Sequence, residues 1–537
     1  MFAQTSKQRL LVVLAGISLL TSISLLYSQV GIYAPIYHYD EGIIAYGAVR
    51  VMQGELPYRD FWTQYSPGQF YLVAGFFKFF GANIMVERWG DSIIRALLAL
   101  MLMALSAQLT HWKFALPTWV FAVLWLNSYT YFGYPIFPAL LFAVASICTL
   151  LRGFTSRRFL CASGILMGLC FLFRHDMAVY LCIAQMFGAL LIMVHKRVEP
   201  NAFGKHTISI IKGVLPYICG ATLVILPISA YFMLHVPLGE LANQLLIFPL
   251  IEFPKVRGLP YPRLACSLDM LPFYAPWLIY AAALSVAILI MIRQQKNDAD
   301  VLRASGIVMV AAFGLCGFNQ MRVRSDLIHT VQFFLMSLIL LPVLFREWRC
   351  KSTASARGIV VAAIIIGIIV ISNPMKEFLH SLRAPGNVRL TSLHEAQTTT
   401  LPRSHDLLAL PEESSVALEI RSLTAPDEYV YIGLNQHDKI FINDVMLYFL
   451  MDRKCPTRYQ ELHPGLANTE PVQREMIADL EKHKPRYMVT TDKFDGVVEA
   501  NDSAKSTHVK LLDTYLSKQY YYIKTIGAYM IYKRNGS

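Results

Sequence analysis

Long apolar runs separated by short polar segments fill the first 373 residues of the chain. A helix needs about 20 apolar residues to cross the hydrocarbon core of a bilayer. The pattern predicts eleven such spans, over residues 10–28, 92–111, 114–131, 135–151, 159–173, 177–194, 213–234, 272–292, 304–320, 327–345 and 358–372. The expected fold class is therefore mainly α, a polytopic membrane protein of about 11 transmembrane helices.

The composition becomes more polar near residue 373, and no further span follows. The predicted organisation is a transmembrane domain at 1–373, a linker rich in Thr and Pro at 374–409, and a C-terminal soluble α/β domain at 410–537. Within that domain, the pattern predicts strands at 429–434, 487–491 and within 520–533, and helices near 443–451, 472–483 and 508–518.

A shorter apolar stretch, Gln69 to Ala82, contains Lys78. Whether it crosses the membrane determines on which side every later loop lies. If it crossed the membrane, the basic clusters after the later spans would all face outward, against the positive-inside rule. We therefore interpret it as a helix lying at the outer interface within a long first external loop, residues 30–91. The N-terminus is then inside and the C-terminal domain outside.

The formal net charge is +12, and the charged residues are distributed in agreement with this topology. With this topology, the inner segments hold 17 Lys and Arg against 4 acids, the outer membrane face holds 11 of each, and residues 374–537 hold 20 against 21. The basic excess is thus an orientation signal and gives no support to a nucleic-acid partner. A mean hydropathy of +0.44 also excludes a single soluble globular protein.

Ionisable residues at the ends of membrane spans are costly and mark candidate sites. Any one of them can also be an interfacial anchor or a helix-cap charge. The turn at 174–176 has almost no loop, so its charges lie at the edge of the hydrocarbon and predict a polar cavity that opens outward. The residues expected on this outer face are Asp40, Glu41, Glu87, Arg88, Asp91, Arg95, Arg174, His175, Asp176, Arg322, Arg324, Asp326 and His329.

The first external loop carries the clearest motif, Tyr39-Asp40-Glu41-Gly42, followed by a Gly-Glu-Leu-Pro-Tyr turn at 54–58 and by Tyr65-Ser66-Pro67-Gly68. Over residues 33–100 the chain resembles membrane glycosyltransferases of the GT-C fold, which use a polyprenyl-phosphate sugar donor. That superfamily contains protein O-mannosyltransferases and aminoarabinose transferases. The segments 174–176 and 324–329 resemble that superfamily more weakly. Aminoarabinose transferases place Lys-Pro-Pro where this chain has Tyr65-Ser66-Pro67.

The resemblance implies inverting transfer of a glycosyl residue to an acceptor hydroxyl on the outer face of the cytoplasmic (inner) membrane. It implies Asp40 as general base, with Glu41 as an orienting group or acceptor contact. A sugar phosphate already has a good leaving group, so cations that hold the phosphate complete the chemistry. Tyr65 either stacks on a sugar or anchors the interface. The remaining candidates for substrate and phosphate binding are Arg88, Arg95, Arg174, His175, Asp176, Arg324, Asp326 and His329.

The expected partners are a polyprenyl-phosphate sugar donor, membrane lipid, and a glycan, lipid or protein acceptor. No cofactor is indicated, although a carboxylate-rich site can bind a divalent metal. The external loop 236–271 either covers the donor groove or is an irregular connector. Two other classes stay open, a transporter or flippase of lipid-linked sugars and a catalytically inactive scaffold; against the transporter, no internal repeat is visible.

Overall fold

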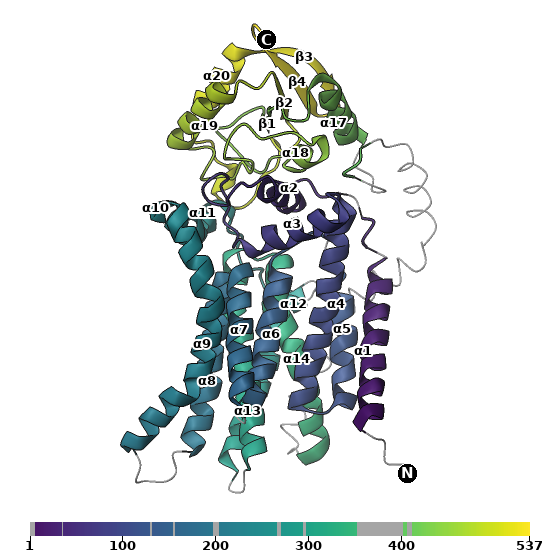
Figure 1. Ribbon diagram of the computed structural model, residues 1–537, viewed down its shortest axis with the longest axis vertical. Coiled ribbons are helices and arrows are strands. Elements are labelled where there is room, and N and C mark those ends of the chain that lie inside the picture. Colours follow the sequence, from purple (N-terminus) through teal and green to yellow (C-terminus); the bar gives the residue numbers. More distant parts are fainter. Residues whose placement is uncertain are drawn as a thin grey trace.

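The computed structural model describes residues 6–29, 31–34, 36–128, 131–153, 156–196, 203–265, 270–293, 297–351, 401–404 and 411–537. Upright helices form a bundle, two short helices lie across one end of it, and the C-terminal domain covers that end (Figure 1). The upright helices are α1 (Ser6–Ser28), α4 (Ile84–Leu109), α5 (Trp112–Leu126), α6 (Ile136–Gly153), α7 (Arg157–Phe173), α8 (His175–Lys196), α9 (Phe203–His235), α12 (Leu271–Ile292), α13 (Asp298–Val323) and α14 (Val331–Lys351).

Ten of the eleven predicted spans coincide with these helices, which confirms a mainly helical, multi-pass membrane protein. Eight helices in the described ranges are long and apolar enough to cross a membrane, and α5 is a shorter apolar helix. The span predicted at 358–372 lies outside the described residues. Helix α14 runs to the end of the bundle opposite the C-terminal domain, and the chain is next described at Leu401, in the core on the domain side.

The helix predicted at the outer interface is α3 (Gly68–Phe80), and it lies across the end of the bundle (Figure 1). It is too short to span a bilayer and ends at Gly81, whose φ of 88° favours glycine. Beside it lies α2 (Asp40–Met52), which the sequence pattern did not predict. Two carboxylates in the first turn of α2, Asp40 and Glu41, favour a helix start through the helix dipole.

The C-terminal domain contains a four-stranded sheet in the order β1-β2-β4-β3. The strands β1 (Val430–Leu434) and β2 (Tyr487–Thr491) are parallel, with Val430 opposite Tyr487, whereas β4 (Tyr529–Arg534) runs antiparallel to β2 and to β3 (Tyr520–Ile526). These strands match the predicted positions. The predicted helices are found as α18 (Met446–Met451), α19 (Glu470–His483) and α20 (Leu511–Gln519). A fourth helix, α17 (Pro411–Leu423), begins at the predicted domain boundary and was not predicted.

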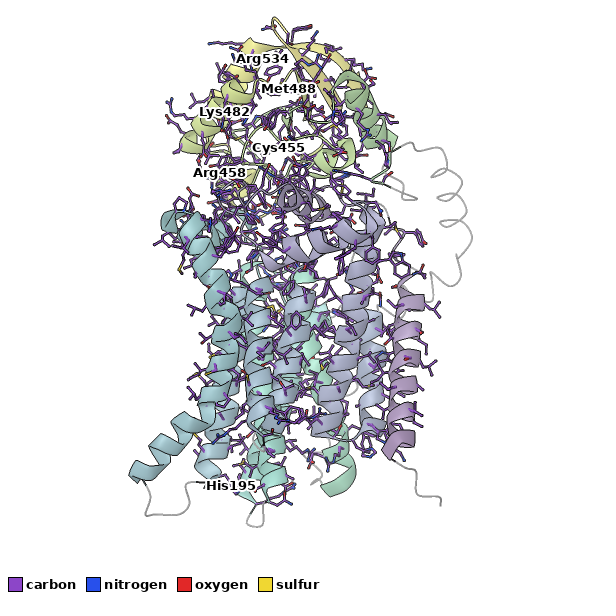
Figure 2. The ribbon with its side chains drawn as sticks, viewed as in Figure 1. His195, Cys455, Arg458, Lys482, Met488 and Arg534 are labelled. Atoms are coloured by element: carbon purple, nitrogen blue, oxygen red, sulfur yellow. The ribbon has the colours of Figure 1, made fainter. Side chains whose placement is uncertain are left out.

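One hydrophobic core is shared between the first external loop and the C-terminal domain. The backbone N–H of Met446 donates to the carbonyl of His38 at 3.0 Å, and Tyr46 stacks on Tyr448 with ring centroids 5.1 Å apart. The Tyr46 hydroxyl accepts from the N–H of Cys455 at 2.7 Å. Figure 2 shows Cys455 well above the bundle, with His195 at the opposite end of the molecule. The C-terminal domain is therefore packed directly against α2.

Between the bundle and the domain lies an irregular connection after α9. It contains α10 (Leu238–Ala242), a ten-residue π-helix, η1 (Asn243–Glu252), and α11 (Phe253–Arg257). Long π-helices are rare and are found mostly at functional sites. This connection falls within the external loop that the sequence predicts over 236–271, and it reaches the membrane-facing side of the C-terminal domain.

Candidate functional site

A cavity of about 630 Å³ lies between the end of the bundle and the C-terminal domain. Its walls come from segments far apart in the sequence: the start of α2, the turn before α3, the α7–α8 turn, η1, the end of α13 and the domain. Eight predicted site residues line it, namely Asp40, Tyr65, Arg174, His175, Asp176, Arg324, Asp326 and His329. Three others, Glu41, Arg88 and Arg95, are not in its lining.

Asp40 is the first residue of α2 and lies at the cavity wall. Within the described part of the chain, its carboxylate makes no hydrogen bond or ion pair. Burial raises the pKa of Asp40 above its usual value, although Arg257, His329 and Arg324 act in the opposite direction. A carboxylate with free lone pairs, facing a cavity and surrounded by cations, has the properties of a general base.

Glu41 points away from the cavity and is fully buried. Its carboxylate accepts from Arg88 at 2.6 and 2.9 Å and from the N–H of Tyr37 at 2.7 Å. Arg88, 1% exposed, also donates to the carbonyl oxygens of Ile32 and Ala34 at 2.8 and 2.6 Å. The pair therefore ties α2 and the preceding loop to α4. The geometry corrects the sequence-based expectation that Arg88 contacts phosphate.

Arg95 has a similar structural environment about two turns further along α4. It pairs with Asp91 at 2.7 Å and donates to the carbonyl of Leu126 at 2.6 Å. Its guanidinium lies 4.4 Å from the ring centroid of Tyr131 and 4.3 Å from that of Phe137. Because it is enclosed by these groups, Arg95 joins α4 to the segment after α5 and is not placed to contact a ligand in the cavity.

The Arg174-His175-Asp176 turn joins α7 to α8 at the cavity wall. Arg174 donates to both carboxylate oxygens of Asp176 at 2.9 and 2.7 Å, and Gln320 donates to the same carboxylate at 2.9 Å. The Ser66 hydroxyl lies 3.0 Å from Nδ1 of His175. The turn thus fixes the adjacent Tyr65-Ser66 segment, and the guanidinium of Arg174 is held in one orientation.

A second arginine cluster lies at the end of α13. Arg324 donates to Asp326 at 2.9 Å and to Glu499 at 2.7 Å, and Arg257 pairs with Glu499 at 3.3 Å. Nδ1 of His329 lies 2.5 Å from Asp326. Burial alone would raise the pKa of Asp326, but the hydrogen bond and charge of His329 and the charge of Arg324 lower it below its ordinary value.

Sequence reasoning missed several residues that line this cavity. Arg257 lies in the external loop that the sequence marks at 236–271, but no motif distinguishes it. Glu461 and His463 come from the C-terminal domain, to which the sequence assigns no role in the site. Only folding brings these residues to Asp40, so local sequence patterns carry no signal for them.

The wall formed by η1 is apolar. Leu245, Leu246, Pro249 and Leu250 line the cavity, and the side chain of Leu250 is 67% exposed. The cavity therefore joins a polar region with arginines and carboxylates to an apolar flank. An amphiphile with an anionic headgroup and a hydrocarbon chain matches this division.

A group that resembles a metal site lies outside the cavity lining. His38, Glu413 and Asp444 offer ligand atoms within 4.8 Å of one another. The Lys493 ammonium lies 3.0 Å from Nε2 of His38 and 2.7 Å from Glu413. The Lys493 ammonium offsets the charge of Glu413, and these contacts link α17 to the first external loop.

Fold and cavity together define a multi-pass membrane protein with a candidate site between its helical bundle and its C-terminal domain. No family model matches the chain, and a search of curated proteins found no similar sequence. Among solved structures, ArnT from Cupriavidus metallidurans bound to undecaprenyl phosphate matches 99% of this chain and 99% of its own, with 12% identity and a TM-score of 0.54.

The Archaeoglobus fulgidus oligosaccharyltransferase, tethered to an acceptor peptide with an NVT sequon, matches 97% of this chain and 74% of its own. Its identity is 11% and its TM-score 0.51. At such identities the likeness concerns the fold. The chain therefore has the GT-C fold, as its first external loop predicted, and the C-terminal domain is included in the match.

Proposed function

We propose that the protein transfers a glycosyl residue from a polyprenyl-phosphate donor to an acceptor hydroxyl, with inversion at the anomeric carbon. The observation that carries the proposal is the position of Asp40, a carboxylate without a partner among the described residues, in a cavity whose other walls supply arginines. The structural neighbours, one of them bound to undecaprenyl phosphate, support a lipid-phosphate donor.

Asp40 takes the proton of the acceptor hydroxyl as its oxygen attacks the anomeric carbon. The bond from that carbon to the phosphate oxygen breaks on the opposite face, and the polyprenyl phosphate leaves with the electron pair. Because phosphate is a stable leaving group, no second carboxyl is needed to protonate it, in contrast to glycoside hydrolysis. One general base is therefore sufficient.

Arg174, Arg257 and Arg324 are the proposed phosphate contacts, because they line the cavity and guanidinium matches phosphate geometry. Each is held by a carboxylate, which fixes its direction before the ligand arrives. The lipid chain would leave along the apolar η1 wall. Tyr65 lines the same cavity and is a candidate to stack on the sugar.

The reaction is proposed to take place on the outer face of the cytoplasmic membrane. Arg293 directly follows α12 and Arg303 lies near the start of α13, and both pair with Glu347 near the end of α14, at the end of the bundle away from the cavity. Basic residues favour the cytoplasmic side. The cavity and the C-terminal domain lie at the opposite end of the bundle.

The test is the variant Asp40→Asn in purified protein, supplied with labelled polyprenyl-phosphate sugars and a cell-envelope acceptor fraction. Loss of a general base should reduce kcat by about 10²–10⁴-fold. The thermal midpoint should change little, since Asp40 makes no hydrogen bond or ion pair with the described residues and would lose only its interaction with the helix dipole. Glu470→Gln, at an exposed ion pair of α19, is the matched control and should transfer normally.

Unchanged transfer by the Asp40→Asn variant would remove Asp40 from the mechanism. Movement of the lipid-linked sugar across vesicles, with no transfer in the unaltered protein, would instead identify a flippase. Mass spectrometry of the envelope glycans with and without the protein identifies the sugar and the acceptor.

A further inference from the structure

The C-terminal domain brings one ionisable side chain into the cavity without a compensating partner. Glu461 is 1% exposed, and both of its carboxyl oxygens are buried with no hydrogen-bond partner among the described residues. It contrasts with Glu41, which is equally buried but paired with Arg88. A buried polar group that forms no hydrogen bond costs stability, so an explanation for Glu461 is needed.

The surroundings of Glu461 show which ligand it suits. Asp40 is the charged group that most affects it, and burial together with that negative charge raises its pKa well above its ordinary value. Burial and the charge of Asp40 thus favour the protonated carboxyl, which offers both an O–H donor and an acceptor oxygen. The nearby Tyr39 hydroxyl also lines the cavity and has no partner in the described structure.

His463 adds a third neutral group on the same wall. Its Nδ1 lies 2.9 Å from the carbonyl of Pro464, so Nδ1 carries the hydrogen and Nε2 is left as an acceptor. Burial and the neighbouring Arg257 lower the pKa of His463 to about 3. His463 is therefore a neutral hydrogen-bonding group beside Glu461 at neutral pH.

The backbone at Glu461 is held rigidly. The side chain of Asn443, itself buried, donates to the carbonyl of Gln460 at 2.9 Å and accepts from the N–H of Leu462 at 2.8 Å. These two bonds fix the residues before and after Glu461. A side chain placed this firmly, without a protein partner, is preorganised for a ligand.

We propose that Glu461 is a substrate-binding residue whose carboxyl group hydrogen-bonds a sugar hydroxyl beside the reacting centre. The inference deepens the proposed function and rests on it. The hydroxyl belongs either to the glycosyl group of the donor or to the acceptor, and both present the same chemistry. The C-terminal domain thereby selects the substrate, while the bundle supplies the base and the phosphate contacts.

The first experiment measures thermal stability without ligand. The variants Glu461→Gln and Glu461→Leu should have midpoints equal to or above that of the unaltered protein, because each removes a carboxyl that has no partner. Glu41→Leu is the matched control and should lower the midpoint. A lower midpoint for both Glu461 variants would show a structural role and overturn the proposal.

The second experiment compares the affinity of the protein for bare undecaprenyl phosphate with its affinity for the mannosyl, glucosyl and arabinosyl derivatives. If Glu461 binds the donor sugar, Glu461→Leu should lose about tenfold or more in affinity for the preferred derivative and retain its affinity for the bare lipid. Glu461→Gln should stay close to the unaltered protein, because an amide retains a donor and an acceptor.

If Glu461 binds the acceptor, Glu461→Leu should leave donor affinity unchanged and raise the acceptor KM by a similar factor. No change in either quantity would overturn the proposal. Equal damage in the Gln and Leu variants, with activity that requires an added divalent cation, would also overturn it, because Glu461 would then be a metal ligand. If the unaltered protein binds none of the lipids, the proposed function fails, and the stability experiment alone decides the role of Glu461.

Discussion

Asp40 and Glu41 are neighbours in the sequence with opposite surroundings. Successive residues on a helix point about 100° apart, so one carboxylate faces the cavity while the other faces α4. The resemblance implied Asp40 as general base and Glu41 as an orienting group or acceptor contact, but the sequence could not show that Glu41 pairs with Arg88. Arg88, which pairs with Glu41, lies on a helix whose rotation is decided by packing and not by local pattern.

The fall of kcat/KM at low pH, which is the acid limb of the pH–rate profile, should reflect the raised pKa of Asp40. The base works only when deprotonated, so kcat/KM should fall as the pH drops through a pKa above the ordinary value of about 3.9. Arg257 lowers that pKa, so Arg257→Gln should move the limb to higher pH. The exposed Arg263 of the same loop is the control, and Arg263→Gln should leave the limb in place. A limb that does not move with Arg257→Gln contradicts the assignment.

The Glu41–Arg88 pair should be a stability element. Glu41→Gln leaves a buried guanidinium without its counter-charge, which typically costs about 3–5 kcal/mol. We expect a clear drop in the thermal midpoint in detergent. The double variant Glu41→Leu with Arg88→Met should recover part of that loss, because no unpaired charge remains. An unchanged midpoint in the single variant would show that water reaches Arg88.

At the scale of elements, helix packing in the bundle depends on small residues. The Gly164-x-x-x-Gly168 pattern on α7 allows a close helix contact, and in the structure both glycines lie against α9. A Cβ at Gly164 would overlap the carbonyl oxygen of Tyr217, and one at Gly168 would lie 2.7 Å from Cβ of Val224. Gly220 on α9 meets the carbonyl of Cys161 in the same way.

Gly164→Leu should therefore separate α7 from α9 and lower the thermal midpoint, at a cost of about 1–3 kcal/mol, which is typical of overpacking. Because α7 leads directly into the Arg174 turn, transfer activity should fall as well. Gly16→Leu is the matched control, since a Cβ at Gly16 on α1 meets nothing within 4 Å. Equal midpoints for the two variants would contradict the close contact.

The membrane spans and the strands could be predicted from the sequence because each leaves a local pattern of apolar residues: a long apolar run for a span and a short apolar or alternating run for a strand. Helices α2 and α17 could not, because their burial depends on partners far away in the sequence: Tyr46 of α2 packs on Tyr448. The residues of the candidate site also divide into those that the local sequence reveals and those that depend on distant partners. Charged turns such as 174–176 stand out locally, whereas Arg257, Glu461 and His463 become site residues only after the domain closes over the bundle.

At the scale of the molecule, the two ends of the bundle should lie on opposite sides of the membrane. In a variant without native cysteines, Lys482→Cys in the C-terminal domain should react with an impermeant maleimide in intact spheroplasts (Figure 2). Arg158→Cys, at the start of α7, should react only after permeabilisation. Labelling of Arg158→Cys from outside would reverse the proposed orientation.

The core shared by α2 and α18 has a consequence for biosynthesis. A ribosome synthesises α2 long before α18, so the residues that pack on α2 do not yet exist when this helix is made. Until α18 has been made, the apolar face of α2 is uncovered and the helix has no fixed position. If the proposed function holds, a chain that terminates before α18 should therefore be inactive.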